Sequence, residues 1–454
     1  MSATTDTIAA VATAPGRGAV GIVRLSGPQA FAIAARMAGE LPPPRHAALR
    51  AFRDAGGEVL DQGLVLAFPH PDSYTGEDVV ELQGHGGPLV LDLLVRAACE
   101  CGARPARPGE FSERAFVNGR MDLAQAEAVA DLINAATAEA ARAAQRSLHG
   151  EFSARVRALT EELVELRVFV EGALDFSDED VDWLSDAALR GRLEALLAHL
   201  RELLAAAAQG RRLREGLTVA LAGQPNVGKS TLLNGLAGTD AAIVTEIPGT
   251  TRDVLRENVN VGGLPVTVVD TAGLRDGSDP VEKIGVERAW RAVHDAELVL
   301  FLVDDRAGVT EADRALLARL PAGAEVIVVR NKCDLSGEPP GPVGAPLRRD
   351  PYAELRLCAK SGAGLDPLKQ EIRRVAGLSA TGESLFSART RHVDALQRAL
   401  ACAADADKRL REGATAELAA EDLRLAQRAL SEITGAFTTE DLLGRIFSQF
   451  CIGK

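Results

Sequence analysis

A short segment with two glycines, Gly223–Ser230, strongly constrains the fold and the ligand class of this chain. It reads GQPNVGKS, lies after the apolar run Leu217–Ala222 and precedes the helix-like stretch Thr231–Leu236. A GxxxxGKS motif in this strand–loop–helix context predicts a phosphate-binding loop, since its glycines let backbone N–H groups turn towards phosphates and the helix N-terminus adds partial positive charge. We expect Lys229 to neutralise the β- and γ-phosphates of a nucleotide and the Ser230 hydroxyl to ligate Mg²⁺.

Buried strands alternate with helix-like segments over the region around this loop. The apolar runs are Leu217–Ala222, Val266–Val269, Leu298–Val303, Val326–Val329 and Leu355–Leu357. Strands that alternate with helices in this way predict a parallel sheet in an α/β domain.

Three further motifs end strands of this region, at the edge where open α/β sheets bind ligands. They are Asp270-Thr271-Ala272-Gly273, Asn331-Lys332-Cys333-Asp334 and Cys358-Ala359-Lys360. Asp270 can hold Mg²⁺ through water, and the Gly273 N–H can contact a γ-phosphate. Asp334 can accept from both N1–H and the 2-amino group of guanine, while the Ala359 N–H would face guanine O6. Adenine offers neither donor to Asp334, so the motifs predict a site that selects GTP over ATP.

The flanking regions differ in pattern from this α/β block. Strand-like runs such as Val20–Leu25 and Val79–Leu82, broken by Gly and Pro, predict a small α+β domain before about residue 120. Two Ala/Leu/Arg-rich stretches, one on each side of the block, predict helices. We therefore expect an α+β N-terminal domain (1–120), a discontinuous α-helical domain (121–215 plus 380–454) and an α/β nucleotide-binding domain (216–379) inserted into it.

Charge and composition exclude several classes of protein. Lys and Arg number 51 against 64 Asp and Glu, a net charge of −13, so a protein that grips nucleic acid over its whole surface is excluded, although a local basic patch is not. No apolar run approaches the ~18 residues of a membrane span. Six Cys without a CxxC or metal-ligand spacing fit reduced thiols. These features predict a cytoplasmic chain with no membrane partner.

Taken together, the motifs give a specific resemblance that covers essentially the whole chain. The sequence resembles the MnmE (also called TrmE) family of tRNA uridine-modification GTPases. The segments that carry the resemblance are PNVGKST at 225–231, GTTRD at 249–253, DTAGLR at 270–275, VEKIGVERA at 281–289, GEDVVELQGHGG at 76–87, DLAQAEAVADLI at 122–133 and the C-terminal Cys451-Ile452-Gly453-Lys454.

The resemblance implies a Ras-like P-loop domain whose GTPase is activated by potassium and which dimerises through its G domains. The implied GTP-binding residues are Asn226, Val227, Gly228, Lys229, Ser230, Thr231, Thr245, Glu246, Ile247, Pro248, Gly249, Thr250, Thr251, Asp270, Thr271, Ala272, Gly273, Asn331, Lys332, Asp334, Cys358, Ala359 and Lys360. The implied K⁺ ligands are Asn226, Thr245, Ile247 and Thr250, and the implied Mg²⁺ ligands are Ser230 and Thr251. Lys229 and Glu282 would be catalytic. Glu282 would orient the attacking water indirectly, in place of the Gln that is absent at Leu274.

The resemblance also implies a one-carbon donor, 5-formyltetrahydrofolate or methylenetetrahydrofolate, bound by Arg24, Glu81, Arg120 and Lys454. A carboxylate such as Glu81 can pair with the 2-amino-pyrimidinone face of a pterin, and Arg or Lys can meet its glutamyl tail. Cys451 is a candidate nucleophile, and a packing role suits it equally well.

The implied reaction adds an aminomethyl or carboxymethylaminomethyl group at C5 of the wobble uridine of certain tRNAs. The implied partners are tRNA, a second copy of the chain, and the flavin-dependent subunit MnmG (GidA) in a heterotetramer or larger complex. A GxGxxG spacing occurs at Gly16–Gly21, but it runs into the strand-like stretch Val20–Leu25 and does not open a helix. It is therefore not a dinucleotide fingerprint, and the flavin is expected on that subunit. Two alternatives share the G domain: a GTP-driven module for ribosome assembly and a free-standing signalling switch. Neither gives a role to the flanking domains.

Overall fold

The computed structural model describes residues 6–175, 187–238, 256–270, 280–321, 323–344, 352–378, 385–412, 416–436 and 440–453. The chain divides into two compact units, which we describe separately. Unit 1 comprises 1–130, 156–160 and 427–454, and unit 2 comprises 131–155 and 161–426. Among the described residues, no helix combines the length and the apolar character needed to cross a bilayer. The three-part division expected from sequence stays a prediction.

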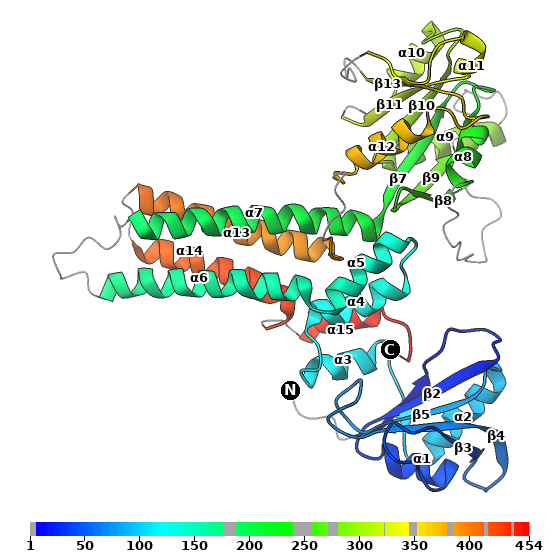
Figure 1. The fold of residues 1–454 in the computed structure, drawn as a ribbon, viewed down its shortest axis with the longest axis vertical. Helices are drawn as coiled ribbons and strands as arrows, with labels where there is room; N and C mark the ends of the chain where they lie inside the picture. Colours follow the sequence, from blue (N-terminus) through cyan, green and yellow to red (C-terminus); the bar gives the residue numbers. More distant parts are fainter. Residues whose placement is uncertain are drawn as a thin grey trace. The chain divides into compact units, whose positions relative to one another are not determined.

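Unit 1 is built on a six-stranded sheet of order β3-β4-β5-β2-β1-β6 (Figure 1). Its elements are β1 (Ile8–Val11), β2 (Val20–Ser26), α1 (Ala30–Ala38), β3 (Ala48–Arg53), β4 (Val59–Phe68), β5 (Val79–His85), α2 (Pro88–Glu100), β6 (Arg104–Pro105) and α3 (Glu110–Val117). All neighbouring strands are antiparallel except β1 and β6, which run parallel. The two strands expected here, Val20–Leu25 and Val79–Leu82, are confirmed as β2 and β5.

Alternation along the strands gives this sheet two different faces. Val23 and Leu25 of β2, and Val80 and Leu82 of β5, are buried against helices α1 and α2. Successive side chains point to opposite faces of a sheet. The intervening residues, Arg24 among them, therefore lie on the face away from α1 and α2.

The C-terminal end of the chain packs within unit 1. Helix α15 (Glu440–Ser448) forms an apolar cluster with the start of α4 (Leu123–Ile133), in which Phe447 and Leu123 are buried. Beyond the helix, the Cys451 carbonyl accepts a hydrogen bond from Gly109 N–H at 3.3 Å.

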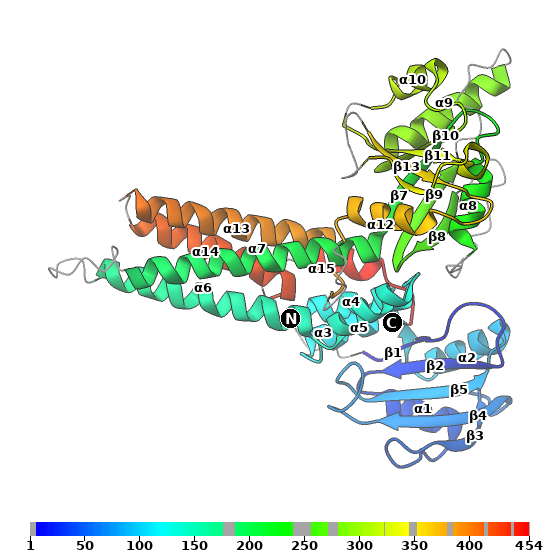
Figure 2. The ribbon, with the colours of Figure 1, turned by 45° about the horizontal axis from the view of Figure 1, so that its top comes forward.

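The long helices α5 (Ala138–Leu148), α6 (Glu151–Asp175), α7 (Ala187–Glu215), α13 (Thr390–Arg411) and α14 (Ala416–Thr434) form the helical part of the chain. Helices α7 and α13 lie side by side (Figures 1 and 2), although the whole α/β segment separates them in sequence. The α/β segment is thus inserted between two neighbouring helices, as expected from the sequence.

The α/β segment contains a seven-stranded sheet of order β12-β13-β11-β10-β7-β9-β8. Its elements are β7 (Leu217–Gly223), α8 (Lys229–Ala237), β8 (Arg256–Val261), β9 (Leu264–Asp270), α9 (Pro280–Asp295), β10 (Leu298–Asp304), α10 (Glu311–Leu317), β11 (Glu325–Asn331), α11 (Cys333–Ser336), β12 (Gly341–Pro342), β13 (Ala353–Leu357) and α12 (Leu365–Val375). The five central strands are parallel and confirm the expected strands, whereas the edge strands β8 and β12 are antiparallel and were not expected.

Helices cover both faces of this sheet. On β10, Leu300 and Leu302 face a core that includes Leu232 of α8, while Phe301 faces a second core that includes Val293 of α9. Strands buried on both faces read as continuous apolar runs, which is why periodicity found them in the sequence.

Candidate functional site

The glycine-rich loop joins β7 to α8 and requires two of its glycines. Gly223 has a φ of +134°, and a Cβ there would lie 2.3 Å from the carbonyl oxygen of Leu302. Gly228 has a φ of +100°, and its Cβ would lie 2.3 Å from Nδ2 of Asn331. Both the backbone conformation and the close contacts therefore exclude larger residues. Asn226, whose φ is +63°, has the residue type that best tolerates this region apart from glycine.

The cationic residue Lys229 and the hydroxyl residue Ser230 lie in the first turn of α8. Lys229 begins α8, and its Nζ donates to the carbonyl oxygens of Gly223 and Gln224 at 3.1 Å each. Ser230 follows in the first turn of α8 and is exposed. A lysine held over the loop and an accessible hydroxyl at a helix N-terminus are a donor set that fits a Mg²⁺-bound triphosphate.

Asn331 joins the phosphate loop to the two guanine-recognition segments. Its side chain is buried, donates through Nδ2 to the Val227 carbonyl at 2.8 Å, and accepts through Oδ1 from Ala359 N–H at 3.0 Å. The Ala359 N–H, expected to face guanine O6, is therefore engaged by Asn331 in this structure. Asp334, in α11, and Lys360 are exposed, so both are accessible to a nucleotide base.

A second link runs from Lys332, whose backbone is left-handed with a φ of +66°. Its Nζ donates to Asn226 carbonyl at 2.8 Å and lies 3.0 Å from Oδ2 of Asp304, the last residue of β10. Hydrogen bonds from Arg306, together with the charge of Lys332, hold the pKa of Asp304 well below its usual range. Lys332 is thus anchored at the carboxyl edge of the sheet.

The sequence alone predicts no role for Asp305, which directly follows β10 and links neighbouring elements at the same edge of the sheet. Its buried carboxylate lies 2.7 Å from Nε of Arg330 and 3.3 Å from Nε of Arg356, and it accepts from the Ser336 hydroxyl. These partners come from β11, β13 and α11, so one carboxylate joins three elements that carry or directly precede the predicted guanine-recognition residues. The only indication of Asp305 in the sequence is that it follows Asp304 directly after the apolar run Leu298–Val303.

Several predicted site residues lie outside the described residues: Thr245, Glu246, Ile247, Pro248, Gly249, Thr250, Thr251, Thr271, Ala272, Gly273 and Lys454. Asp270 is the last residue of β9, opposite Leu221 of β7. Glu282 lies in the first turn of α9.

The predicted folate residues Arg24 and Glu81 are brought together by strand register. They face each other on β2 and β5, and Nε and one terminal nitrogen of Arg24 donate to Glu81 Oε1 at 3.0 and 2.9 Å. The other carboxylate oxygen, Oε2, has a longer contact of 3.4 Å from Gln83 Nε2. A carboxylate anchored through one oxygen in this way can still accept through the other, which fits an amino-pyrimidinone ligand.

Two other contacts concern the remaining folate residues. Arg120 is exposed, and its Cγ would lie 3.1 Å from a Cβ at Gly76 in the loop before β5. Gly453, the last described residue, packs closely on the Val11 carbonyl, and Val11 pairs with Val23 beside Arg24. The structure therefore places the end of the described chain on the strand next to the one that carries Arg24. Cys451 is exposed.

Comparison with known proteins agrees with this organisation. The family model of the GTP-binding protein TrmE N-terminus matches residues 7–120, and that of the MnmE helical domain matches residues 123–451. The chain is 55% identical over 458 residues to a tRNA modification GTPase MnmE from Pseudomonas paraeruginosa, with 100% of both chains covered. The chain belongs to the MnmE family. It is therefore a GTPase of tRNA modification.

Further relatives give the same result. The MnmE of Methylococcus capsulatus is 55% identical over 449 residues, with 99% of each chain covered, and that of Pseudomonas aeruginosa strain PAO1 is 54% identical over 458 residues, with 100% covered. Among solved structures, the G domain of the T. maritima FeoB iron transporter is 27% identical with a TM-score of 0.28 and covers 35% of this chain and 98% of that chain. The family assignment rests on the MnmE relatives and the family models.

Proposed function

We propose that this member of the MnmE family is a cytoplasmic, potassium-activated GTPase whose G domains dimerise during hydrolysis. We further propose that it acts with the flavin-dependent subunit MnmG, in a heterotetramer or larger complex, to modify C5 of the wobble uridine of certain tRNAs. The added group would be aminomethyl or carboxymethylaminomethyl, with its carbon taken from 5-formyl- or methylenetetrahydrofolate. The observation that carries the proposal is the Asn331 bridge between the predicted phosphate loop and guanine-recognition segment, in the same chain as the Arg24–Glu81 pair.

In the proposed nucleotide site, the residues of this chain would bind and orient GTP and its cations. Lys229 would neutralise phosphate charge, the loop amides held by Gly223 and Gly228 would surround the phosphates, and Asp334 would select guanine. Ser230, with Thr251, would hold Mg²⁺, while Asn226, with Thr245, Ile247 and Thr250, would hold K⁺. The two cations would supply positive charge for the developing transition state of phosphoryl transfer.

Cation dependence tests the first part of the proposal. We expect GTP turnover of the full-length protein to be strong in KCl and weak in NaCl, and Asn226→Ala to remove the difference. Asn258→Ala is the matched control, because Asn258 lies on the exposed edge strand β8 and bonds only Thr267 among the described side chains. Equal rates of the wild-type protein in both salts would contradict potassium activation.

The one-carbon part rests on the N-terminal sheet. Glu81 would accept hydrogen bonds from the pyrimidinone ring, and Arg24, Arg120 and Lys454 would meet the anionic glutamyl tail. The register of β2 and β5 supports this assignment because it holds Arg24 and Glu81 on one face, away from helices α1 and α2. When bound, the folate would supply the one-carbon unit. The residues named would only fix where it lies.

A tRNA-modification assay with and without the flavin subunit tests the complete function. We expect modified wobble uridine only when this chain, the flavin subunit, GTP and the folate are all present. A ribosome-assembly module or a signalling switch would hydrolyse GTP but give no modified tRNA under the same conditions. That outcome would favour one of those alternatives.

A further inference from the structure

The guanidinium of Arg24 is bounded by more than its partner carboxylate. Its central carbon lies 5.3 Å from the ring centroid of Tyr74 and 5.7 Å from that of Phe111. Both distances are within the range of cation–π attraction. Arg24 therefore has an ion pair to Glu81 and two aromatic rings beside it, and its side chain is only 20% exposed.

Tyr74 is itself fixed by a hydrogen bond to helix α3. Its hydroxyl lies 2.8 Å from the Ser112 hydroxyl, and Ser112 follows Phe111 on that helix. Burial raises the pKa of Tyr74 despite this hydrogen bond and the nearby Arg24 charge, so the phenol stays neutral at physiological pH. A neutral, anchored ring keeps one place beside Arg24.

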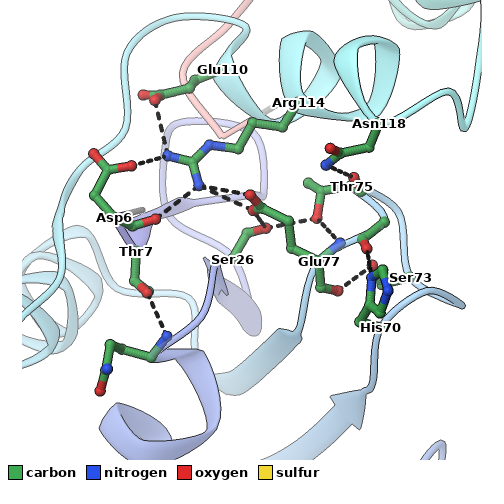
Figure 3. Close-up of polar contacts among 12 residues, drawn as sticks. Asp6, Thr7, Ser26, His70, Ser73, Thr75, Glu77, Glu110, Arg114 and Asn118 are labelled. Carbon is green, nitrogen blue, oxygen red and sulfur yellow. Dashed lines mark hydrogen bonds and ion pairs between the residues drawn. The ribbon is translucent and has the colours of Figure 1, made fainter. Parts of the chain in front are cut away.

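The loop that carries Tyr74 is held by side-chain hydrogen bonds on both sides of that residue (Figure 3). The Ser26 hydroxyl, at the end of β2, lies 2.7 Å from Thr75 Oγ1 and donates to Glu77 Oε2 at 2.7 Å. Ser73 donates to the Glu77 carbonyl at 2.6 Å, and Asn118 Nδ2 donates to the Thr75 carbonyl at 2.8 Å. The loop is thus tied to strand β2 and to the end of α3.

Arg114 connects this loop to two other segments (Figure 3). One terminal nitrogen donates to Glu77 Oε2 and to the Asp6 carbonyl, both at 3.0 Å, and the other donates to Asp6 Oδ1 at 2.9 Å and Glu110 Oε1 at 3.3 Å. Both Arg114 and Glu110 are buried. A buried fork of this kind fixes the positions of all three segments relative to one another.

We propose that Tyr74 is a positioning residue for Arg24 in the ligand site of the N-terminal sheet, and that Arg114 sets the place of Tyr74 by holding its loop. The inference rests on the proposed folate site. A guanidinium held between aromatic rings and Glu81 Oε1 cannot swing into solvent. Glu81 is then held in place through Oε1, with its second oxygen available to a pterin.

The affinity of the full-length protein for 5-formyltetrahydrofolate, measured by titration calorimetry, tests the role of the ring. Tyr74→Leu should weaken binding by about five- to tenfold, the size of a partly buried cation–π contact. Tyr74→Phe keeps the ring and should bind within about threefold of wild type, since it loses only one neutral hydrogen bond. Tyr74→Met replaces the Leu variant in this comparison if the latter does not fold.

Tyr352→Leu is the matched control, because Tyr352 is the only other tyrosine of the chain and packs in a core of the α/β segment. It should leave folate affinity unchanged. Arg114→Lys keeps the positive charge but not the two-pronged guanidinium contact, and it should weaken folate binding. In the double variant, Tyr74→Leu should reduce folate affinity by a smaller factor than it does alone, since both changes act on one loop.

The outcomes separate this inference from the folate site itself. Loss of binding in Glu81→Gln together with wild-type affinity in Tyr74→Leu would overturn the positioning role and leave the folate site in place. Wild-type affinity in Arg114→Lys would overturn the role of Arg114. No binding to the wild-type protein would overturn the folate site and this inference with it.

Discussion

The amide nitrogen of Asn331 donates to the carbonyl oxygen of Val227 at 2.8 Å, across 104 residues of sequence. The same side chain accepts from Ala359 N–H at 3.0 Å, so one buried amide holds the phosphate loop and the last guanine-recognition segment together. The predicted phosphate loop and the predicted guanine-recognition segment are therefore coupled through one buried side chain.

Asn331→Ala should weaken GTP binding and destabilise the α/β segment by about 2–3 kcal/mol, because it removes two hydrogen bonds and leaves a buried carbonyl and a buried N–H unpaired. Fluorescent GTP-analogue titration and denaturant unfolding measure the two effects. The exposed Asn258→Ala is the control for each. Unchanged affinity for GTP would show that the bridge does not position the loop.

Gly228→Ala tests the close approach of the loop to Asn331. A Cβ at Gly228 would lie 2.3 Å from Nδ2, in addition to the strain of a φ of +100°. Gly377→Ala is the matched control, since its φ of +75° imposes the strain with no atom within 4 Å of the new Cβ. We expect Gly377→Ala to cost about 1 kcal/mol of stability and leave GTP affinity unchanged, whereas Gly228→Ala should abolish measurable binding. Similar effects of the two variants would rule out the steric argument.

Asp334→Asn should shift nucleotide preference from guanine to xanthine, because an amide can donate to the 2-oxo group of xanthine while a carboxylate accepts from the 2-amino group of guanine. Competition between GTP and XTP for the fluorescent analogue measures the shift. We expect GTP affinity to fall by about 10²-fold, the size of discrimination from a lost pair of charge-assisted hydrogen bonds. Unchanged GTP affinity would contradict the assignment of 331–334 to guanine.

The central strands of the α/β segment could be predicted because burial on both faces leaves continuous apolar runs, as in Leu298–Val303. The edge strand β8 (Arg256–Val261) could not, since four of the six residues of its sequence RENVNV are polar and its pairing with β9 is set by the turn at Gly262 and Gly263. Edge strands have one unpaired side, so their composition carries little of the signal that buried strands carry.

The sequence predicts residues for contact with nucleotide and folate, and these stay predictions, whereas it gives no prediction for the residues that hold those side chains in place. Arg24 and Glu81 were expected from the resemblance, but nothing in the sequence indicated that Tyr74 lies beside Arg24 or that Arg114 holds the loop of Tyr74. Arg114 reads as one charged residue on an ordinary helix, and only the tertiary fold shows it to be buried among three carboxylates. Residues that hold other side chains in place do so through contacts distant in sequence, and hydrophobic periodicity carries no information about such contacts.

Acid should destabilise unit 1 through Glu110. Burial would raise the pKa of this carboxyl, but the hydrogen bond from Arg104, the Arg107 N–H and the charges of Arg104 and Arg114 outweigh it and lower the pKa to about 2. A carboxyl with a depressed pKa stabilises the fold above its ordinary pKa of 4.5 and loses that contribution as the pH falls towards 2.

Glu110→Gln should therefore lower stability at pH 7 by on the order of 2 kcal/mol and flatten its dependence between about pH 4.5 and 2. Thermal unfolding at a series of pH values measures both effects. Glu113→Gln, on the same helix and paired with the exposed Arg107, is the control and should keep the wild-type pH profile. An unchanged profile in Glu110→Gln would show that other carboxyls cause the acid sensitivity.

Glu282→Ala should separate hydrolysis of GTP from its binding. Glu282 lies in the first turn of α9, directly after the segment that follows Asp270. A carboxylate that only orients the attacking water contributes to the transition state and little to ground-state affinity. We expect the single-turnover hydrolysis rate to fall by on the order of 10²-fold, within the range for a lost water-orienting or general-base group, with GTP affinity nearly unchanged.

Glu287→Ala is the matched control, since Glu287 is an exposed carboxylate on the same helix and should leave both quantities as in the wild type. In the complete complex with the flavin subunit, Glu282→Ala should also depress tRNA modification, because the conformational cycle driven by hydrolysis would stall. Hydrolysis at the wild-type rate would return Glu282 to the status of a surface carboxylate. A parallel loss of affinity would point instead to a folding defect at the start of α9, and equal losses in the Glu287 variant would confirm that reading.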